Sequence, residues 1–98
     1  MAIKMTIPEF DGKADPEAYM IWEEKVEKIF NIYDYSERKK LKLAVVEFTG
    51  HASIWWRKTS QLREEKYKKL VISWDTLKQL MRKKYISSHH KRDMLHKL

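Results

Sequence analysis

The sequence predicts an all-α fold, a compact bundle of four to five helices with an extended N-terminal arm, and three observations support this class. The 98 residues include only two Gly and two Pro, whereas an all-β chain of this length needs many more turn residues. Apolar residues recur at intervals of three and four, which is the period of a helix. The four Trp, five Tyr and three Phe provide the large side chains that the core of a small domain requires.

The arm is expected over residues 1–14, which lack helical periodicity, and a single helical domain over residues 15–98. Asp15-Pro16-Glu17 predicts the start of the first helix. A carboxylate can cap free amides, proline suits the first helical position, and Glu17 complements the positive end of the helix dipole. The apolar stripe of this helix consists of Ala18, Trp22, Val26, Ile29, Phe30 and Tyr33.

The second helix is expected to open at Ser36 and to stop at Gly50, because glycine is common just past helix ends. Its core face carries Leu41, Ala44, Val45 and Phe48. Leu43 and Val46 fall on the opposite side. A helix that is apolar on two sides is either central to the bundle or offers a second surface to a partner.

The third helix is expected to begin near His51 and to run to about Lys66. Trp55 and Trp56 flank the centre of its apolar face. A pair of indoles could form a ligand-binding box, but their helical spacing favours a place in the core. Ile54 points away from that face.

The fourth helix is expected after Ser73, with Asp75 in its first turn and Ile72 and Leu77 placed as a hydrophobic staple. Its apolar stripe consists of Trp74, Leu77, Leu80, Met81 and Tyr85. A short fifth helix is expected around Met94, Leu95 and Leu98. Over all the helices, the predicted core consists of Trp22, Phe30, Leu41, Val45, Phe48, Trp55, Trp56, Trp74, Leu77 and Met81.

Three apolar residues off the core stripes, Leu43, Val46 and Ile54, are the candidate surface for assembly or for binding a peptide. Two alternatives stay open. Single exposed apolar residues need no functional explanation, and helix packing can bury Leu43 and Val46.

The net charge of +7 is unevenly distributed along the chain. Residues 1–50 carry eight Lys and Arg against ten Asp and Glu, a balance of −2, and residues 51–98 carry thirteen against four, a balance of +9. A basic half attracts nucleic acid or an acidic partner, although a solvated lysine-rich face is an equally good interpretation. The candidate phosphate contacts are Lys66, Lys68, Lys69, Arg82, Lys83, Lys84, Lys91 and Arg92.

Several classes of protein are disfavoured by what the sequence lacks. Without cysteine there is no disulfide, thiolate nucleophile or cysteine-based zinc site. No apolar run of about 18 residues can span a bilayer, so we expect a cytoplasmic protein without membrane contact. His89, His90 and His96 lack the spacing of a metal site. No catalytic triad, phosphate loop or carboxylate pair stands out, so we expect no enzyme activity, no cofactor and no small-molecule substrate.

Three motifs follow one another in order along residues 7–98. The first is Ile7-Pro8-Glu9-Phe10-Asp11-Gly12, followed by Asp15-Pro16-Glu17-Ala18-Tyr19 and Trp22. The second is Lys42-Leu43-Ala44-Val45-Val46-Glu47-Phe48, followed by Gly50-His51-Ala52 and Trp55-Trp56. The third is Ser73-Trp74-Asp75-Thr76-Leu77-Lys78, followed by Met81-Arg82-Lys83-Lys84-Tyr85. In this order and spacing they resemble the plant-type Gag proteins of gypsy-class LTR retrotransposons. Members of that family often carry phenylalanine where Tyr85 stands.

The resemblance implies the N-terminal lobe of a retroviral-type capsid protein, a helical bundle that packs laterally into a shell around the element's RNA. It implies weak contacts with other Gag subunits, so the isolated lobe should be monomeric at low concentration. It also implies a second capsid lobe and a zinc-knuckle nucleocapsid encoded beyond Leu98. Domesticated Gag relatives bind short peptides in a groove of this lobe. The alternative function is therefore an adaptor that binds a peptide or, without sequence preference, RNA.

A rival interpretation is a sequence-specific DNA-binding helix-turn-helix, with its turn at Thr49-Gly50-His51. The second helix of such a motif needs Arg, Asn, Gln or Ser to contact base edges. Here that helix opens with Ala52, Ile54, Trp55 and Trp56. The residue types therefore favour an assembly module over a reader of DNA sequence.

Overall fold

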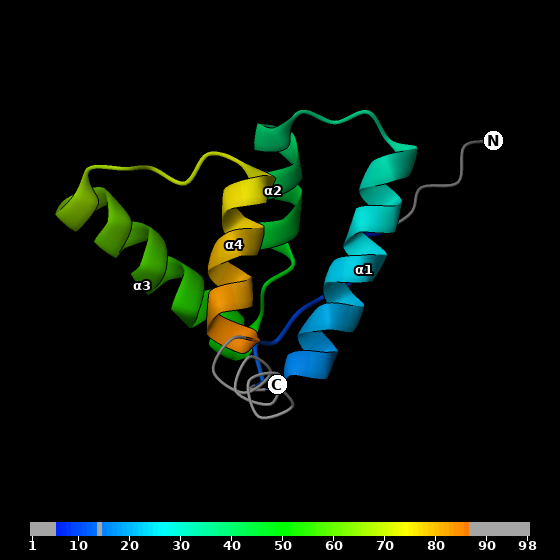
Figure 1. Cartoon of the computed structure of the whole chain (residues 1–98), viewed down its shortest axis with the longest axis horizontal. Helices are drawn as coiled ribbons and strands as arrows, with labels where there is room; N and C mark the ends of the chain where they lie inside the picture. The colour runs from blue at the N-terminus through cyan, green and yellow to red at the C-terminus, as the bar shows by residue number, and fades with distance from the viewer. Residues whose placement is uncertain (1–5, 14, 87–98) are drawn as a thin grey trace, which may run out of the picture.

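The computed structural model describes residues 6–13 and 15–86, which form four helices and no strand. These are α1 (Pro16–Ile32), α2 (Glu37–Val46), α3 (Gly50–Tyr67) and α4 (Trp74–Tyr85), shown in Figure 1. The all-α prediction is confirmed. The expected fifth helix around Met94, Leu95 and Leu98 lies outside the described residues.

Three of the helices begin where their capping residues predict. Asp15 accepts a hydrogen bond from the backbone N–H of Glu17 at 3.0 Å. Ser36 and Ser73 each accept one from the residue three positions later, at 3.2 and 3.1 Å. Each side chain thereby satisfies an amide that has no partner within its helix. The predicted staple at the start of α4 does not bury Ile72, whose side chain is 59% exposed.

The end of α2 differs from the prediction. We expected Gly50 to stop this helix, but α2 ends at Val46 and Gly50 is the first residue of α3, with a φ of +48°. The reason is a contact with the arm. The N–H of Phe10 donates to the carbonyl of Glu47 at 3.0 Å, and the carbonyl of Phe10 accepts from Thr49 at 2.9 Å. Backbone groups that a longer helix would use are therefore paired with the arm.

The described part of the arm is extended, as predicted, and it is also a structural part of the bundle. Ile7 and Phe10 are buried, and the ring of Phe10 lies 5.2 Å from that of Trp22 and 5.1 Å from that of Tyr85. The indole N–H of Trp22 donates to the carbonyl of Pro8 at 2.8 Å. The arm is therefore held to α1 and α4 by packing and by a hydrogen bond.

The core lies between the arm, α1, α2 and α4, and α3 contributes little to it. Its buried apolar side chains are Ile7, Phe10, Tyr19, Trp22, Val26, Ile29, Phe30, Leu41, Ala44, Phe48, Ala52, Trp74, Leu77, Met81 and Tyr85. Three residues that we placed in the core, Val45, Trp55 and Trp56, are only partly buried and pack against its edge. The two indoles are only partly buried because α3 diverges from the other helices (Figure 1), and Ala52 is the one buried residue of this helix.

Polar contacts join α1 to α4 along one side of the core. Arg82 donates to both carboxylate oxygens of Glu23, at 2.8 and 2.6 Å. Lys78 pairs with Glu27 at 3.0 Å, and the indole N–H of Trp74 also donates to Glu27. These pairs connect residues 47 to 59 positions apart in the sequence and so fix how the two helices pack.

Candidate assembly and nucleic-acid surfaces

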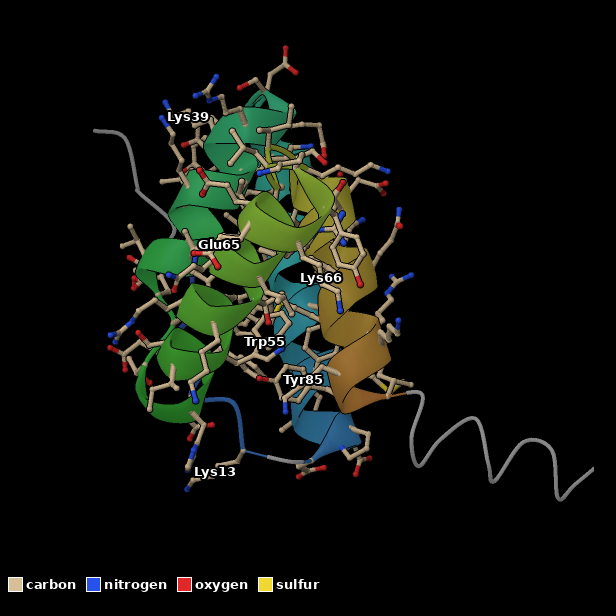
Figure 2. The ribbon with its side chains drawn as sticks, turned by 90° about the vertical axis from the view of Figure 1, so that its left-hand side faces the viewer. Lys13, Lys39, Trp55, Glu65, Lys66 and Tyr85 are labelled. Atoms are coloured by element: carbon tan, nitrogen blue, oxygen red, sulfur yellow. The ribbon has the colours of Figure 1, made fainter. Side chains whose placement is uncertain are left out.

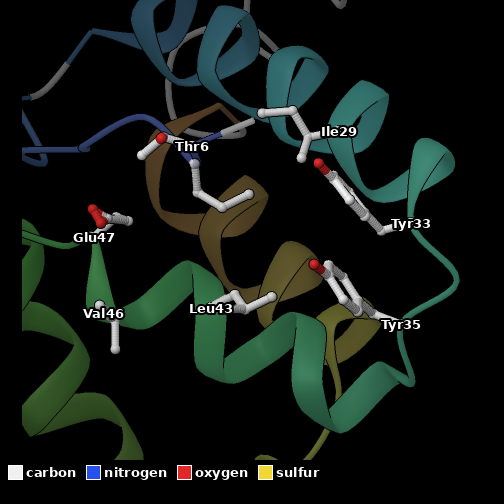
Figure 3. A pocket seen from close by; sticks show the side chains of 8 residues that line it. Thr6, Ile29, Tyr33, Tyr35, Leu43, Val46 and Glu47 are labelled. Carbon is white, nitrogen blue, oxygen red and sulfur yellow. The ribbon is translucent and has the colours of Figure 1, made fainter. Parts of the chain in front are cut away.

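An apolar groove of about 320 Å³ lies between the arm, the end of α1 and one face of α2. Figure 3 shows it with Tyr33 and Tyr35 side by side at one end and Val46 and Glu47 at the other. The two tyrosine rings are stacked, with centroids 5.2 Å apart and an interplanar angle of 10°. The full lining is Thr6, Ile7, Ile29, Tyr33, Tyr35, Leu43, Val46 and Glu47.

The second apolar face of α2 opens onto this groove. Leu41 and Ala44 face the core and are buried, whereas Leu43 is partly buried and Val46 is 77% exposed. Helix packing therefore covers Leu43 in part and leaves Val46 open. An exposed apolar residue beside a concave apolar surface is a feature of protein contact sites.

A second hollow, of about 540 Å³, lies between the arm, α3 and α4. We call it the basic pocket, and its lining is Gly12, Lys13, His51, Ile54, Trp55, Lys58, Lys84 and Tyr85. Figure 2 shows Trp55 and Tyr85 next to each other beneath α3, with Lys13 below them. The three residues of the candidate surface therefore line two different hollows: Leu43 and Val46 line the apolar groove, and Ile54 lines the basic pocket.

The wall of the basic pocket contains a polar atom without a partner. The hydroxyl of Tyr85 is buried and makes no hydrogen bond with the described residues. Burial raises the pKa of this hydroxyl to about 12, and the negative charge of Asp11 adds to the shift. The hydroxyl therefore stays protonated at neutral pH. Buried polar groups in proteins are almost always hydrogen-bonded, so this hydroxyl is an exception among the described residues.

The candidate phosphate contacts fall into different parts of the molecule. Lys66, Lys68 and Lys69 are exposed at and beyond the end of α3, Lys83 is exposed on α4, and Lys84 lines the basic pocket. Arg82 is paired with Glu23, so a phosphate would have to compete with a bidentate ion pair. Lys91 and Arg92 lie outside the described residues.

Two lysines of the basic pocket were not among the candidates. Lys13 belongs to the arm and Lys58 to α3, far apart in the sequence. Only the docking of the arm against α3 places them together. The backbone N–H of Ala52 donates to the carbonyl of Asp11 at 3.0 Å and fixes this contact.

The start of α3 is poorly suited to reading DNA. In a helix-turn-helix protein the first residues of the second helix contact the bases. Here Ala52 is fully buried and Trp55 and Trp56 pack against the core. The last four residues of α3, 64–67, are all exposed, and they include charged residues of both signs.

Residues 6–13 and 15–86 lack two further classes of site. No helix there is long and apolar enough to cross a membrane. The same residues contain no group of three His, Asp or Glu side chains that could hold a metal ion. His89, His90 and His96 lie outside this part of the chain.

Comparison with known proteins places the chain in a family. The family model described as the N-terminal capsid-like domain of retrotransposon-derived protein PEG10 matches residues 4–86. No curated protein gives a significant match, and neither does any solved structure. The matched segment takes in the arm from residue 4 onward and all four helices. The chain therefore belongs to the family of retrotransposon-derived N-terminal capsid-like domains.

Proposed function

We propose that this chain is the capsid-forming module of a Gag polyprotein from a gypsy-class, plant-type retrotransposon. In this proposal it self-associates in the cytoplasm into particles that enclose the RNA of the element. The family match carries the proposal, because a capsid-like domain has a structural role and belongs to a non-catalytic family.

The apolar groove supports self-association as the mode of action. Val46 is 77% exposed at one end of the groove, and the stacked rings of Tyr33 and Tyr35 form the other end. Interfaces that bury less than about 1,200 Å² typify weak, transient contacts, and we expect the contact at this groove to be of that class. Weak contacts suit a shell, because subunits that bind reversibly can leave wrong positions.

The first test measures self-association of the chain itself. We expect a monomer at about 10 μM and concentration-dependent association near 1 mM, the range of a contact worth roughly 4 kcal/mol. Sedimentation velocity measures whether the chain is a monomer at the lower concentration. Changes in backbone amide NMR shifts with concentration locate the contact that forms at the higher one. The shifts should concentrate on the residues around Leu43 and Val46.

The second test places a charge in the groove. Val46→Lys should fold normally, because Val46 is 77% exposed, and should abolish the concentration-dependent shifts. Ile21→Lys is the matched control, since Ile21 is 63% exposed and lies on α1 outside the groove. Joined to the second capsid lobe of a Gag polyprotein, the Val46 variant should give fewer particles in electron micrographs than the control, because linked weak contacts reinforce one another. Normal particles from the Val46 variant would remove this groove from the proposal.

The same groove favours one alternative, a Gag-derived adaptor that binds a short peptide. Its apolar lining and aromatic pair fit an apolar peptide side chain. The two functions differ in a measurable way. An adaptor would show no self-association near 1 mM, and a peptide selected from a random library would shift the amide signals of Leu43 and Val46.

A further inference from the structure

We propose that the basic pocket is a contact site for single-stranded RNA. One base lies against the indole of Trp55, and the flanking phosphates are bound by Lys13, Lys58 and Lys84. This inference extends the proposed function, because it assigns a place where enclosed RNA touches the capsid module. It concerns a different surface from the apolar groove, so the two can be tested separately.

Charge is the first argument for a polyanionic ligand. The pocket is lined by three lysines and by no carboxylate. Lys13 has an ion-pair partner, Asp11 at 3.9 Å, but both of these side chains are more than half exposed. Among the described residues, no carboxylate pairs with Lys58 or Lys84. Three cations around one hollow hold a positive potential that a row of phosphates would neutralise.

The aromatic lining is the second argument, because it separates a nucleic acid from a simple anion. Trp55 is only partly buried and lines the pocket. Its indole lies 6.0 Å from the ring of Tyr85 at an interplanar angle of 63°, so the tyrosine supports the indole edge-on rather than covering it in a stack. Proteins that bind single strands combine a basic groove with aromatic rings on which bases stack.

An acidic peptide is the main competing ligand, and the backbone around the pocket argues against it. Extended peptides are usually held by main-chain hydrogen bonds to an open edge. The N–H and carbonyl of Phe10 are already bonded to Glu47 and Thr49, and the carbonyl of Asp11 is bonded to Ala52. These backbone groups of the arm beside the pocket are therefore not open to an extended peptide.

The test titrates the chain into a fluorescently labelled oligouridylate of about 12 nucleotides, a length within the usual site size. Lys58→Ala combined with Lys84→Ala should weaken binding by about tenfold at low salt. It should also lower the slope of log K against log salt by about 1.4, since each phosphate contact on a single strand contributes about 0.7. Lys39→Ala combined with Lys42→Ala is the matched control, because it removes the same charge from exposed positions on α2 that do not line the pocket. The control pair should weaken binding less than threefold, and melting curves verify that all variants fold.

Two further measurements test the stacked base. RNA should quench tryptophan fluorescence, and Trp55→Phe should remove most of the quenching. A duplex of the same length should bind more weakly than the single strand, because its bases are already stacked on each other. The proposal would be overturned if the two double-lysine variants lost the same amount of RNA affinity. It would also be overturned if duplex and single strand bound with equal affinity, or if a glutamate-rich peptide bound more tightly than RNA. None of these readouts depends on particle formation. The RNA-binding proposal can therefore fail while the assembly proposal stands, and the assembly proposal can fail while the RNA-binding proposal stands.

Discussion

Replacing Arg82 by alanine tests how much the ion pair between α1 and α4 stabilises the fold. Arg82 on α4 donates two hydrogen bonds to the carboxylate of Glu23 on α1, 59 positions away in the sequence. The same carboxylate accepts a hydrogen bond from the hydroxyl of Tyr19. The Glu23 side chain is only 14% exposed, so Arg82→Ala leaves a largely buried carboxylate without its cation.

The expected cost follows from this geometry. Hydrogen bonds to charged groups stabilise proteins by about 1.5–3 kcal/mol. Arg82 is 55% exposed, and solvent screening moves the value toward the lower end. We therefore expect Arg82→Ala to lower the free energy of unfolding by about 2 kcal/mol, which for a domain of this size lowers Tm by about 8–16 °C.

Chemical denaturation of the variant measures this loss, and Lys28→Ala is its control. Lys28 also pairs with a glutamate, Glu24 at 3.2 Å, but both side chains are at least 70% exposed, so its loss should cost less than about 0.5 kcal/mol. An Arg82→Ala variant as stable as the Lys28→Ala variant would refute the reasoning. The ion pair would then be an exposed contact that contributes nothing measurable.

The pH dependence of the same pair gives an independent check. Burial would raise the pKa of Glu23, but hydrogen bonds from Arg82 and Tyr19 and the charge of Arg82 outweigh it, so the pKa lies below its ordinary value of 4.5. A carboxyl group with a lowered folded pKa stabilises the fold above the unfolded value, and that stability is lost as the pH falls through the folded value. The difference between the wild-type protein and Glu23→Gln should therefore be full at pH 7 and should shrink as the pH falls below about 4.

The remaining three predictions concern the stability of the fold. Trp74→Ala should cost about 3–5 kcal/mol because Trp74 is 1% exposed, whereas Trp55→Ala, at the edge of the core, should cost about 1–2 kcal/mol; denaturant titration of both compares them. Gly12→Ala should lower the free energy of unfolding by more than about 2 kcal/mol, because its Cβ would lie 2.4 Å from the backbone nitrogen of Ala52. Gly50→Ala should lower it by about 1 kcal/mol, from its positive φ alone. Thermal melting of the two variants separates the steric clash from the conformational strain. Tyr85→Phe should leave Tm unchanged or raise it, because it removes a buried hydroxyl that has no partner.

The sequence by itself determined the helices and where most of them begin. Caps at Asp15, Ser36 and Ser73 act within three residues, so their effect can be predicted from a short segment of the sequence. Helical spacing likewise identified the buried faces of α1 and α4, where Trp22 and Trp74 lie in the core. The order of the motifs indicated the capsid-like family that the comparison then showed.

The tertiary structure decided what depends on contacts between distant segments. The arm ends α2 by pairing with Glu47 and Thr49, a contact that no local pattern encodes. The divergence of α3 leaves Trp55 at the edge of the core, although its spacing matches that of a buried residue. The basic pocket needs Lys13 from the arm and Lys58 from α3, which are neighbours only after folding. Periodicity shows which side of a helix is apolar, but the packing of the other elements decides how far that side is covered.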